Sequence, residues 1–259
     1  MKISKNDILI VLPLSILLIL GLVMVTSSSI YIADGMTSNP FHFAQRQTLF
    51  VSMGLIAMLI FLVLPSDFLY RTDWVFMLLS IFLLIILFIP DVGTSVNGSI
   101  RWIRIGPINV QPSEICKFSL ILYISGYSVR RMSEINSLRS FLKPLILLFI
   151  ISILIMGQPD LGSTAIVCML VVGILFYAGI SFSQLTLLIL LIALLGYLAI
   201  TTSPMRLARV LAFTDPFAVD VVQNAGWQLS NSLISIGQGG WLGVGLGNSF
   251  QKSFFLPEA

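Results

Sequence analysis

Long apolar runs alternate with short polar segments along most of the chain. A helix needs about 20 apolar residues to cross the hydrocarbon layer of a bilayer. Seven runs reach or approach that length, so the pattern predicts seven membrane-spanning helices. We place them at about Ile8–Ser28, Gln47–Leu64, Trp74–Ile89, Pro112–Ser128, Lys143–Met156, Leu161–Gly179 and Gln184–Thr201.

Composition supports a membrane protein. The chain has 259 residues, of which 57% are hydrophobic and 10% charged, whereas a soluble domain carries about 25% charged residues. Too few polar groups remain to cover a surface in water, so we predict an all-α, polytopic membrane protein with a single domain over residues 1–259. The net charge of +3 does not predict a nucleic-acid partner, because basic residues in membrane proteins mark cytoplasmic loops. Cys116 and Cys168 lie in apolar segments and are interpreted as small buried hydrophobic residues, not as a disulfide or metal pair.

The distribution of Lys and Arg predicts which side each loop faces. The best single indication is the cluster from Arg130 to Lys143, because it lies in a short polar loop between two predicted spans and cytoplasmic loops are rich in such residues. The N-terminus is then cytoplasmic, and residues 90–112 and 202–259 form extracytoplasmic loops. The second loop is far longer than a simple connection. It contains several Trp and Phe residues, and we expect a short amphipathic helix at Asn231–Ile236.

A Gln-Pro-Asp turn interrupts two of the apolar runs. Pro159 removes a backbone donor and disfavours helix in the residue before it, so we expect a new helix to begin near Leu161. Asp160 then lies at the N-cap, where a carboxylate accepts backbone N–H groups and meets the positive end of the helix dipole. An ionised carboxylate at membrane depth costs roughly 2.5 kcal/mol or more. Two interpretations remain: a structural cap, or a carboxylate that faces a cavity and holds a cation or a sugar hydroxyl.

Each of the two long loops carries polar side chains that could bind a ligand. Arg101 and Arg104 flank Trp102, and Arg can hold a phosphate with two hydrogen bonds. The alternative is an interfacial anchor, since Trp lies at the level of the lipid headgroups. In the second loop, Gln228 and Ser232 are candidates for binding sugar hydroxyls, although both side chains could equally satisfy the loop backbone.

A charged pair is predicted at the start of the fourth span. Pro112 suits the first turn of a helix, with Gln111 or Ser113 as the candidate cap. Glu114 and Lys117 are three residues apart, on one helical face, and can form an ion pair. Such a pair within an apolar helix is costly unless it faces a polar cavity. The alternative is a structural ion pair in the first helical turn.

Several blocks of sequence, in order along the chain, resemble the SEDS family of polytopic bacterial proteins (shape, elongation, division and sporulation), which includes FtsW, RodA and SpoVE. Together these blocks make the resemblance specific. Within the family, Met24–Ser28 and the ending Leu256–Ala259 are more similar to the cell-division branch than to the elongation branch. The blocks are Asn97–Lys117, Gln158–Ser163, Gly226–Gly237, Gly243–Ser249 and Leu256–Glu258.

The resemblance implies a fold of ten membrane helices with a large outside loop after the seventh. It also implies a peptidoglycan glycosyltransferase that polymerises lipid II at the division septum, on the outer face of the bacterial cytoplasmic (inner) membrane. The implied partners are a class B penicillin-binding protein, which is a transpeptidase, and other membrane proteins of the divisome. A divalent cation, Mg²⁺ or Mn²⁺, is the candidate cofactor.

One departure from the family pattern affects the expected activity. In the family, the Leu-Pro-Glu stretch continues into His-Thr-Asp, and that Asp is the favoured catalytic residue, whereas this chain stops at Ala259. We therefore expect a C-terminally truncated chain that lacks the catalytic Asp and the last three helices. A lipid-linked sugar flippase and a non-catalytic divisome scaffold remain alternatives. The candidate catalytic residue within the chain is Asp160, and the candidate substrate-binding residues are Arg101, Arg104, Glu114, Lys117, Gln228 and Ser232.

Overall fold

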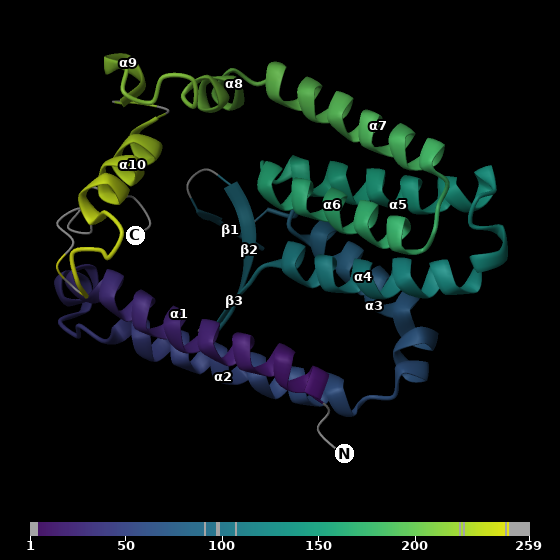
Figure 1. Cartoon of the computed structure of the whole chain (residues 1–259), viewed down its shortest axis with the longest axis horizontal. Coiled ribbons are helices and arrows are strands. Elements are labelled where there is room, and N and C mark those ends of the chain that lie inside the picture. Colours follow the sequence, from purple (N-terminus) through teal and green to yellow (C-terminus); the bar gives the residue numbers. More distant parts are fainter. Residues whose placement is uncertain are drawn as a thin grey trace. The chain divides into compact units, whose positions relative to one another are not determined.

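The computed structural model describes residues 5–90, 92–96, 99–106, 108–222, 224, 226–246 and 248, and Figure 1 shows its helices and strands. The family-like block Leu256–Glu258 lies outside the described residues. The chain divides into two compact units, one formed by residues 1–63 with 199–259 and the other by residues 64–198. Each unit is described by itself.

The first unit contains two long apolar helices that pack against each other along the chain's first quarter. None of the described residues of the second of these helices is buried. Such an apolar and exposed surface fits a lipid environment. The helices of this unit are α1 (Lys5–Thr37), α2 (His42–Val63), α8 (Pro204–Leu211), α9 (Val219–Val222) and α10 (Trp227–Gly239).

The second unit is a helical bundle with a buried apolar core. Its fourth helix, α4, packs against α3 and α6, and α5 packs against α6. Leu84, Leu120, Ile124 and Ile151 are fully buried in this core. The helices are α3 (Ser66–Ile86), α4 (Pro112–Arg130), η1 (Met132–Glu134, a 3₁₀ turn), α5 (Leu138–Gly157), α6 (Leu161–Tyr177) and α7 (Phe182–Thr201), which ends just beyond this unit.

The segment at residues 90–112, which was predicted to be an extracytoplasmic loop, contains a small antiparallel sheet. Its strands are β1 (Gly93–Val96), β2 (Ser99–Ile105) and β3 (Ile108–Val110), in the order β1-β2-β3. Gly106 follows β2 with a φ of 61°, a left-handed conformation that glycine adopts without steric cost. The sheet matters for the site because it is the element that carries Arg101.

The structure confirms an all-α membrane architecture. Each of the seven predicted segments corresponds to a helix from α1 to α7. In the described part of the chain, five of these helices are long and apolar enough to cross a membrane: α1, α2, α3, α5 and α7. Helix α6 is apolar but has 17 residues, and α4 carries Glu114, Lys117 and Arg130 within its length. The count of seven spans and the cytoplasmic N-terminus therefore stay predictions.

Candidate functional site

The turn between α5 and α6 holds Asp160 at the N-cap of α6, as the sequence predicted. Helix α5 ends at Gly157 and α6 begins at Leu161. The carboxylate oxygen Oδ1 of Asp160 accepts a hydrogen bond from the backbone N–H of Ser163 at 3.0 Å, and Oδ2 accepts one from the Ser163 hydroxyl at 2.8 Å. Asp160 is 6% exposed. Although the carboxylate is buried, both of its oxygens therefore accept hydrogen bonds from the first turn of α6.

Helix α3 supports the same turn from the side. The Gln158 side-chain amide, which is buried, donates to the carbonyl oxygen of Leu84 at 3.3 Å. Gly157 lies so close to Phe88 that a Cβ atom there would be 2.9 Å from two carbon atoms of the ring. The absence of a side chain at position 157 lets the end of α5 approach α3, and the buried amide then fixes the turn to it.

Arg101 occupies an irregular position in strand β2. In the pairing with β1, Thr94 lies opposite Trp102 and Ser95 lies opposite Ile100. Arg101, which lies between these two residues of β2, therefore has no paired residue in β1. A β-bulge of this kind leaves one residue unpaired and changes the direction of its side chain. The bulge therefore accounts for how Arg101 can project out of the sheet toward the helices.

The Arg101 guanidinium reaches the α5–α6 turn. Its Nε atom lies 3.7 Å from Oδ2 of Asp160 and donates to the carbonyl oxygen of Gln158 at 3.5 Å. Its Nη2 atom donates to the carbonyl oxygen of Pro159. The Asp160 carboxylate thus lies between a guanidinium and the positive end of α6. The Arg101 side chain remains 35% exposed, so part of its positive charge faces outward.

Glu114 and Lys117 form the ion pair that their spacing predicts. Lys117 Nζ lies 2.7 Å from Glu114 Oε1, with the lysine side chain 16% exposed and the glutamate side chain 57% exposed. Pro112 is in the first turn of α4, also as predicted. The N-cap is Gln111, but its side chain makes no capping hydrogen bond. The ion pair therefore places the ammonium of a mostly buried lysine side chain near the N-terminal end of α4.

The other three candidates, Arg104, Gln228 and Ser232, take no part in the contacts of the α5–α6 turn or of the Glu114–Lys117 pair. Arg104 is exposed on β2, opposite Asn109 of β3. Gln228 and Ser232 lie one turn apart on α10, in the first unit. The Ser232 hydroxyl donates to the Gln228 carbonyl at 2.7 Å, which is a contact with the backbone of its own helix.

A buried ion pair that was not expected from the sequence lies near the other end of the bundle. Asp73 of α3 is 1% exposed, and its Oδ2 lies 2.7 Å from Nη1 of Arg130 in α4. The Arg130 guanidinium also lies over the Tyr70 ring at 5.1 Å and donates to the Tyr70 carbonyl at 3.3 Å. The signal available in the sequence was one acidic residue directly before the apolar run from Trp74.

The described residues do not fit a divalent cation held by several protein ligands. In the described ranges, no group of three or more His, Cys, Asp or Glu side chains gathers. Divalent cations such as Mg²⁺ prefer several oxygen ligands, and both oxygens of Asp160 already accept hydrogen bonds beside a guanidinium. We therefore propose no chemical step that needs a divalent cation bound to these side chains.

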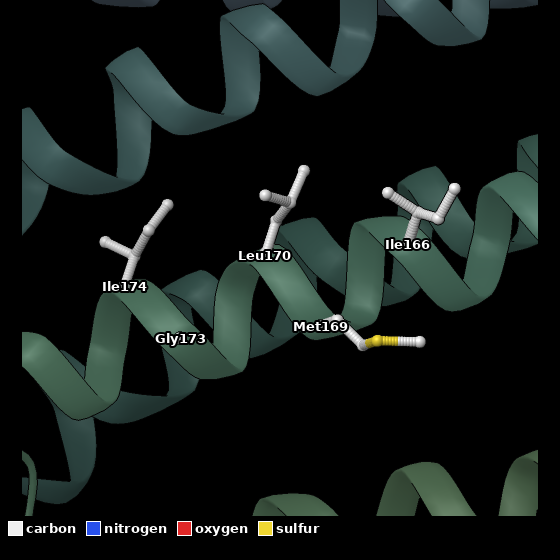
Figure 2. Close-up of a pocket in the computed structure, with 5 residues that line it drawn as sticks. All are labelled: Ile166, Met169, Leu170, Gly173 and Ile174. Carbon is white, nitrogen blue, oxygen red and sulfur yellow. The ribbon is translucent and has the colours of Figure 1, made fainter. Parts of the chain in front are cut away.

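Helix α6 also carries a shallow apolar depression of about 330 Å³. Figure 2 shows Ile166, Leu170 and Ile174 projecting from one side of the helix and Met169 from another, around Gly173. No polar side chain lines it, so it offers no group for acid–base or phosphate chemistry. On a membrane helix such a surface suits contact with lipid chains.

Comparison with known proteins relates the chain to bacterial cell-wall proteins. One relative, described as a probable peptidoglycan glycosyltransferase FtsW from Alkalilimnicola ehrlichii, is 44% identical over 241 residues, which cover 93% of this chain and 60% of the relative. Another of the same description, from Legionella pneumophila, is 43% identical over 94% of this chain and 61% of the relative. The chain thus spans about three fifths of the length of these relatives.

Solved structures support the same relationship. A chain described under structural coordination of polymerization and crosslinking by a peptidoglycan synthase complex matches with a TM-score of 0.63 and 25% identity, covering 87% of this chain and 65% of that one. The rod shape determining protein RodA from Thermus thermophilus shares the fold, with a TM-score of 0.55 and 24% identity over 70% of this chain and 57% of that one. The sequence model of the cell cycle proteins FtsW, RodA and SpoVE matches residues 7–259. This multi-pass membrane chain therefore belongs to the FtsW/RodA/SpoVE family of cell cycle proteins.

Proposed function

We propose that this chain forms part of a peptidoglycan glycosyltransferase that polymerises lipid II into glycan strands during bacterial cell division. The names of its relatives support this activity. The structural observation that carries the proposal is the contact between Arg101 and the α5–α6 turn. There, a buried carboxylate at a break between two apolar helices orients a partly exposed guanidinium. A purely structural cap needs no such arginine.

The reaction requires positive charge where the pyrophosphate leaves the anomeric carbon, because preorganised donors stabilise charge that develops in the transition state. Arg101 and Lys117 are the proposed donors to the pyrophosphate, and exposed Arg104 is proposed to attract the same anion. Asp160 and Glu114 hold these cations in place through the contacts described above. Asp160 is thus a positioning residue in this proposal, and not the general base.

The proposal extends to the acceptor and to the partners. Gln228 and Ser232 are proposed to bind sugar hydroxyls. A class B penicillin-binding protein is the proposed partner, supported by the similarity to a chain from a complex that both polymerises and crosslinks. Other membrane proteins of the divisome complete the proposed assembly. We propose that this assembly lies in the inner membrane at the septum. In this proposal the N-terminus of the chain is cytoplasmic, and residues 90–112 and 202–259 lie outside.

The charge of Asp160 can be tested separately from its capping role. Asn caps a helix about as well as Asp, so Asp160→Asn in the full-length protein keeps the cap and removes the charge beside Arg101. We expect this variant to lose at least about tenfold of its lipid II polymerisation, roughly 1.4 kcal/mol of transition-state stabilisation. The measurement is glycan length from labelled lipid II, with the transpeptidase partner present. Membrane level and co-purification of the partner serve as controls.

Two results would contradict the proposal. Normal polymer yield from Asp160→Asn would reduce Asp160 to a helix cap. Transport of labelled lipid II across liposomes without lengthening of glycan would favour a flippase. A scaffold predicts that Arg101, Glu114, Lys117 and Asp160 can each be replaced without loss of function, so Arg101→Gln and Lys117→Gln belong in the same assay.

A further inference from the structure

Helix α8 (Pro204–Leu211) is apolar on one side and basic on the other. At 3.6 residues per turn, Leu207, Ala208 and Leu211 fall on one face together with Pro204 at the helix start. Arg206 and Arg209 fall on the opposite face. Helices with an apolar face and a basic face lie in membrane interfaces, where the apolar face enters the headgroup region.

The position of α8 in the chain places it at such an interface. Helix α7 is long and apolar enough to cross a membrane and ends at Thr201. Ser203, in an extended conformation, is the N-cap of α8, so only Thr202 and Ser203 separate the two helices. A two-residue connection cannot carry α8 far from the level at which α7 leaves the membrane.

The two arginines of α8 make different contacts. Arg206 is partly buried, and its Nη1 donates to the carbonyl oxygen of Ala199 at 3.0 Å. Cations are favoured at the C-terminal end of a helix, where carbonyl groups lack intrahelical partners, so Arg206 ties α8 to the end of α7. Arg209 is exposed, and in the described part of the chain it makes no ion pair.

Large apolar side chains of α8 and of the residues just after it are exposed. Met205 is 60% exposed, Leu211 is 55% exposed and Phe213, just beyond the helix, is 70% exposed. Apolar surface of this extent beside a membrane span is stabilised when it enters the interfacial region of the bilayer. The basic residues beside it would then lie at the level of the lipid phosphates, which attract them electrostatically.

We propose that α8 lies in the plane of the membrane surface, with Leu207 and Leu211 inserted among the lipids, and that Arg209 binds the phosphate of anionic phospholipids. The membrane span directly before α8 and the exposed apolar side chains of α8 favour a lipid over a protein as the occupant of this surface, and the lipid phosphate complements the charge of the guanidinium. Arg206 holds the helix at the end of α7 and so sets its depth. This binding surface includes none of the residues of the α5–α6 turn.

Site-directed fluorescence tests the insertion. The full chain is placed in nanodiscs with Cys116 and Cys168 replaced by Ala, and a polarity-sensitive dye is attached through Leu207→Cys, Leu211→Cys or Arg209→Cys. We expect lipids with a quencher on the acyl chain to quench the dye at positions 207 and 211, and far less at position 209. Equal accessibility of all three positions to an aqueous quencher would overturn the proposal. So would protection of these positions only when the transpeptidase partner is added, because the surface would then bind protein.

Lipid retention tests the role of Arg209. The chain is extracted from vesicles of equal parts phosphatidylglycerol and phosphatidylcholine, and bound lipids are counted by native mass spectrometry. Arg209→Gln is expected to lower retained phosphatidylglycerol about fivefold without changing retained phosphatidylcholine. Arg209→Lys, the matched control, keeps the charge and should retain most of it. Equal phosphatidylglycerol retention in Arg209→Gln and the unmodified chain would overturn the assignment of Arg209.

Discussion

The bundle formed by α3 to α6 contains two buried carboxylates near opposite ends, and their charges are balanced in different ways. Asp73 contacts Arg130 directly at 2.7 Å, and that arginine is held in turn by Tyr70. Asp160 accepts both of its short hydrogen bonds from Ser163, while Arg101 lies farther away at 3.7 Å and donates to backbone carbonyls. An arginine therefore neutralises the first carboxylate, whereas a helix N-terminus solvates the second.

This difference separates a structural ion pair from a candidate site. Removing Arg130 would leave a buried charge without a counter-ion, which is strongly unfavourable. Arg101 can move away from Asp160 without leaving the carboxylate oxygens unsatisfied. A group that must exchange its contacts for those of a substrate needs this freedom, so the α5–α6 turn suits function and the Asp73–Arg130 pair suits stability.

The sharpest test of the comparison removes each arginine in turn. Arg130→Ala is expected to lower the free energy of unfolding by about 2–3 kcal/mol, the low end for a broken buried pair because Arg130 is partly exposed. Arg101→Ala should cost about 1 kcal/mol, as for lost hydrogen bonds. Unfolding of the purified chain in detergent micelles measures both. The double variant Asp73→Asn/Arg130→Gln should recover part of the loss, and a larger effect at Arg101 would reverse our ranking.

Two glycines allow a second test at the same two ends. A Cβ at Gly126 would lie 2.2 Å from Asp73 Oδ2, and one at Gly157 would lie 2.9 Å from carbon atoms of the Phe88 ring. Overpacking costs typically 1–3 kcal/mol, so we expect about 2 kcal/mol for Gly126→Ala and about 1 kcal/mol for Gly157→Ala in the same unfolding assay. Phe88→Leu should partly rescue the second variant and leave the first unchanged. If Phe88→Leu rescued both glycine variants, the destabilisation would not come from the local contacts at Gly126 and Gly157.

The capping contribution of Asp160 should be smaller. Asp160→Ala removes both acceptors for Ser163 and is expected to cost about 1 kcal/mol, whereas Asp160→Asn should cost only a few tenths. Protease resistance and thermal unfolding of the two variants measure this difference. If Asn destabilised the chain as much as Ala, the contact with Arg101 would contribute more to stability than the cap.

The smallest effect is expected on α4. Glu114→Gln removes an ion pair whose glutamate is 57% exposed, and exposed pairs contribute about 0–1 kcal/mol. We therefore expect less than about 0.5 kcal/mol change in unfolding. A loss above about 1 kcal/mol would place Glu114 with Asp73 among the structural carboxylates.

Local spacing alone allowed several features to be predicted. Apolar run lengths gave the helices α1 to α7, Pro159 gave the break, and Asp160 was placed correctly at its N-cap. The pair between Glu114 and Lys117 followed from their three-residue separation. A helix at Asn231–Ile236 of the long loop was expected as well, although α10 extends from Trp227 to Gly239. Each of these depends on neighbours within one or two helical turns, which a sequence displays directly.

Contacts between distant segments were decided only by the tertiary structure. Arg101 meets the carbonyl of Pro159 across 58 residues, Arg130 meets that of Tyr70 across 60, and Gln158 meets that of Leu84 across 74. The first depends on a register irregularity in a sheet, and the others depend on which helix faces pack together. By itself the sequence determined where helices begin, break and carry charge, because those properties are local. Which charges meet was settled by packing, since helix length and apolar content do not specify how two helices are rotated against each other.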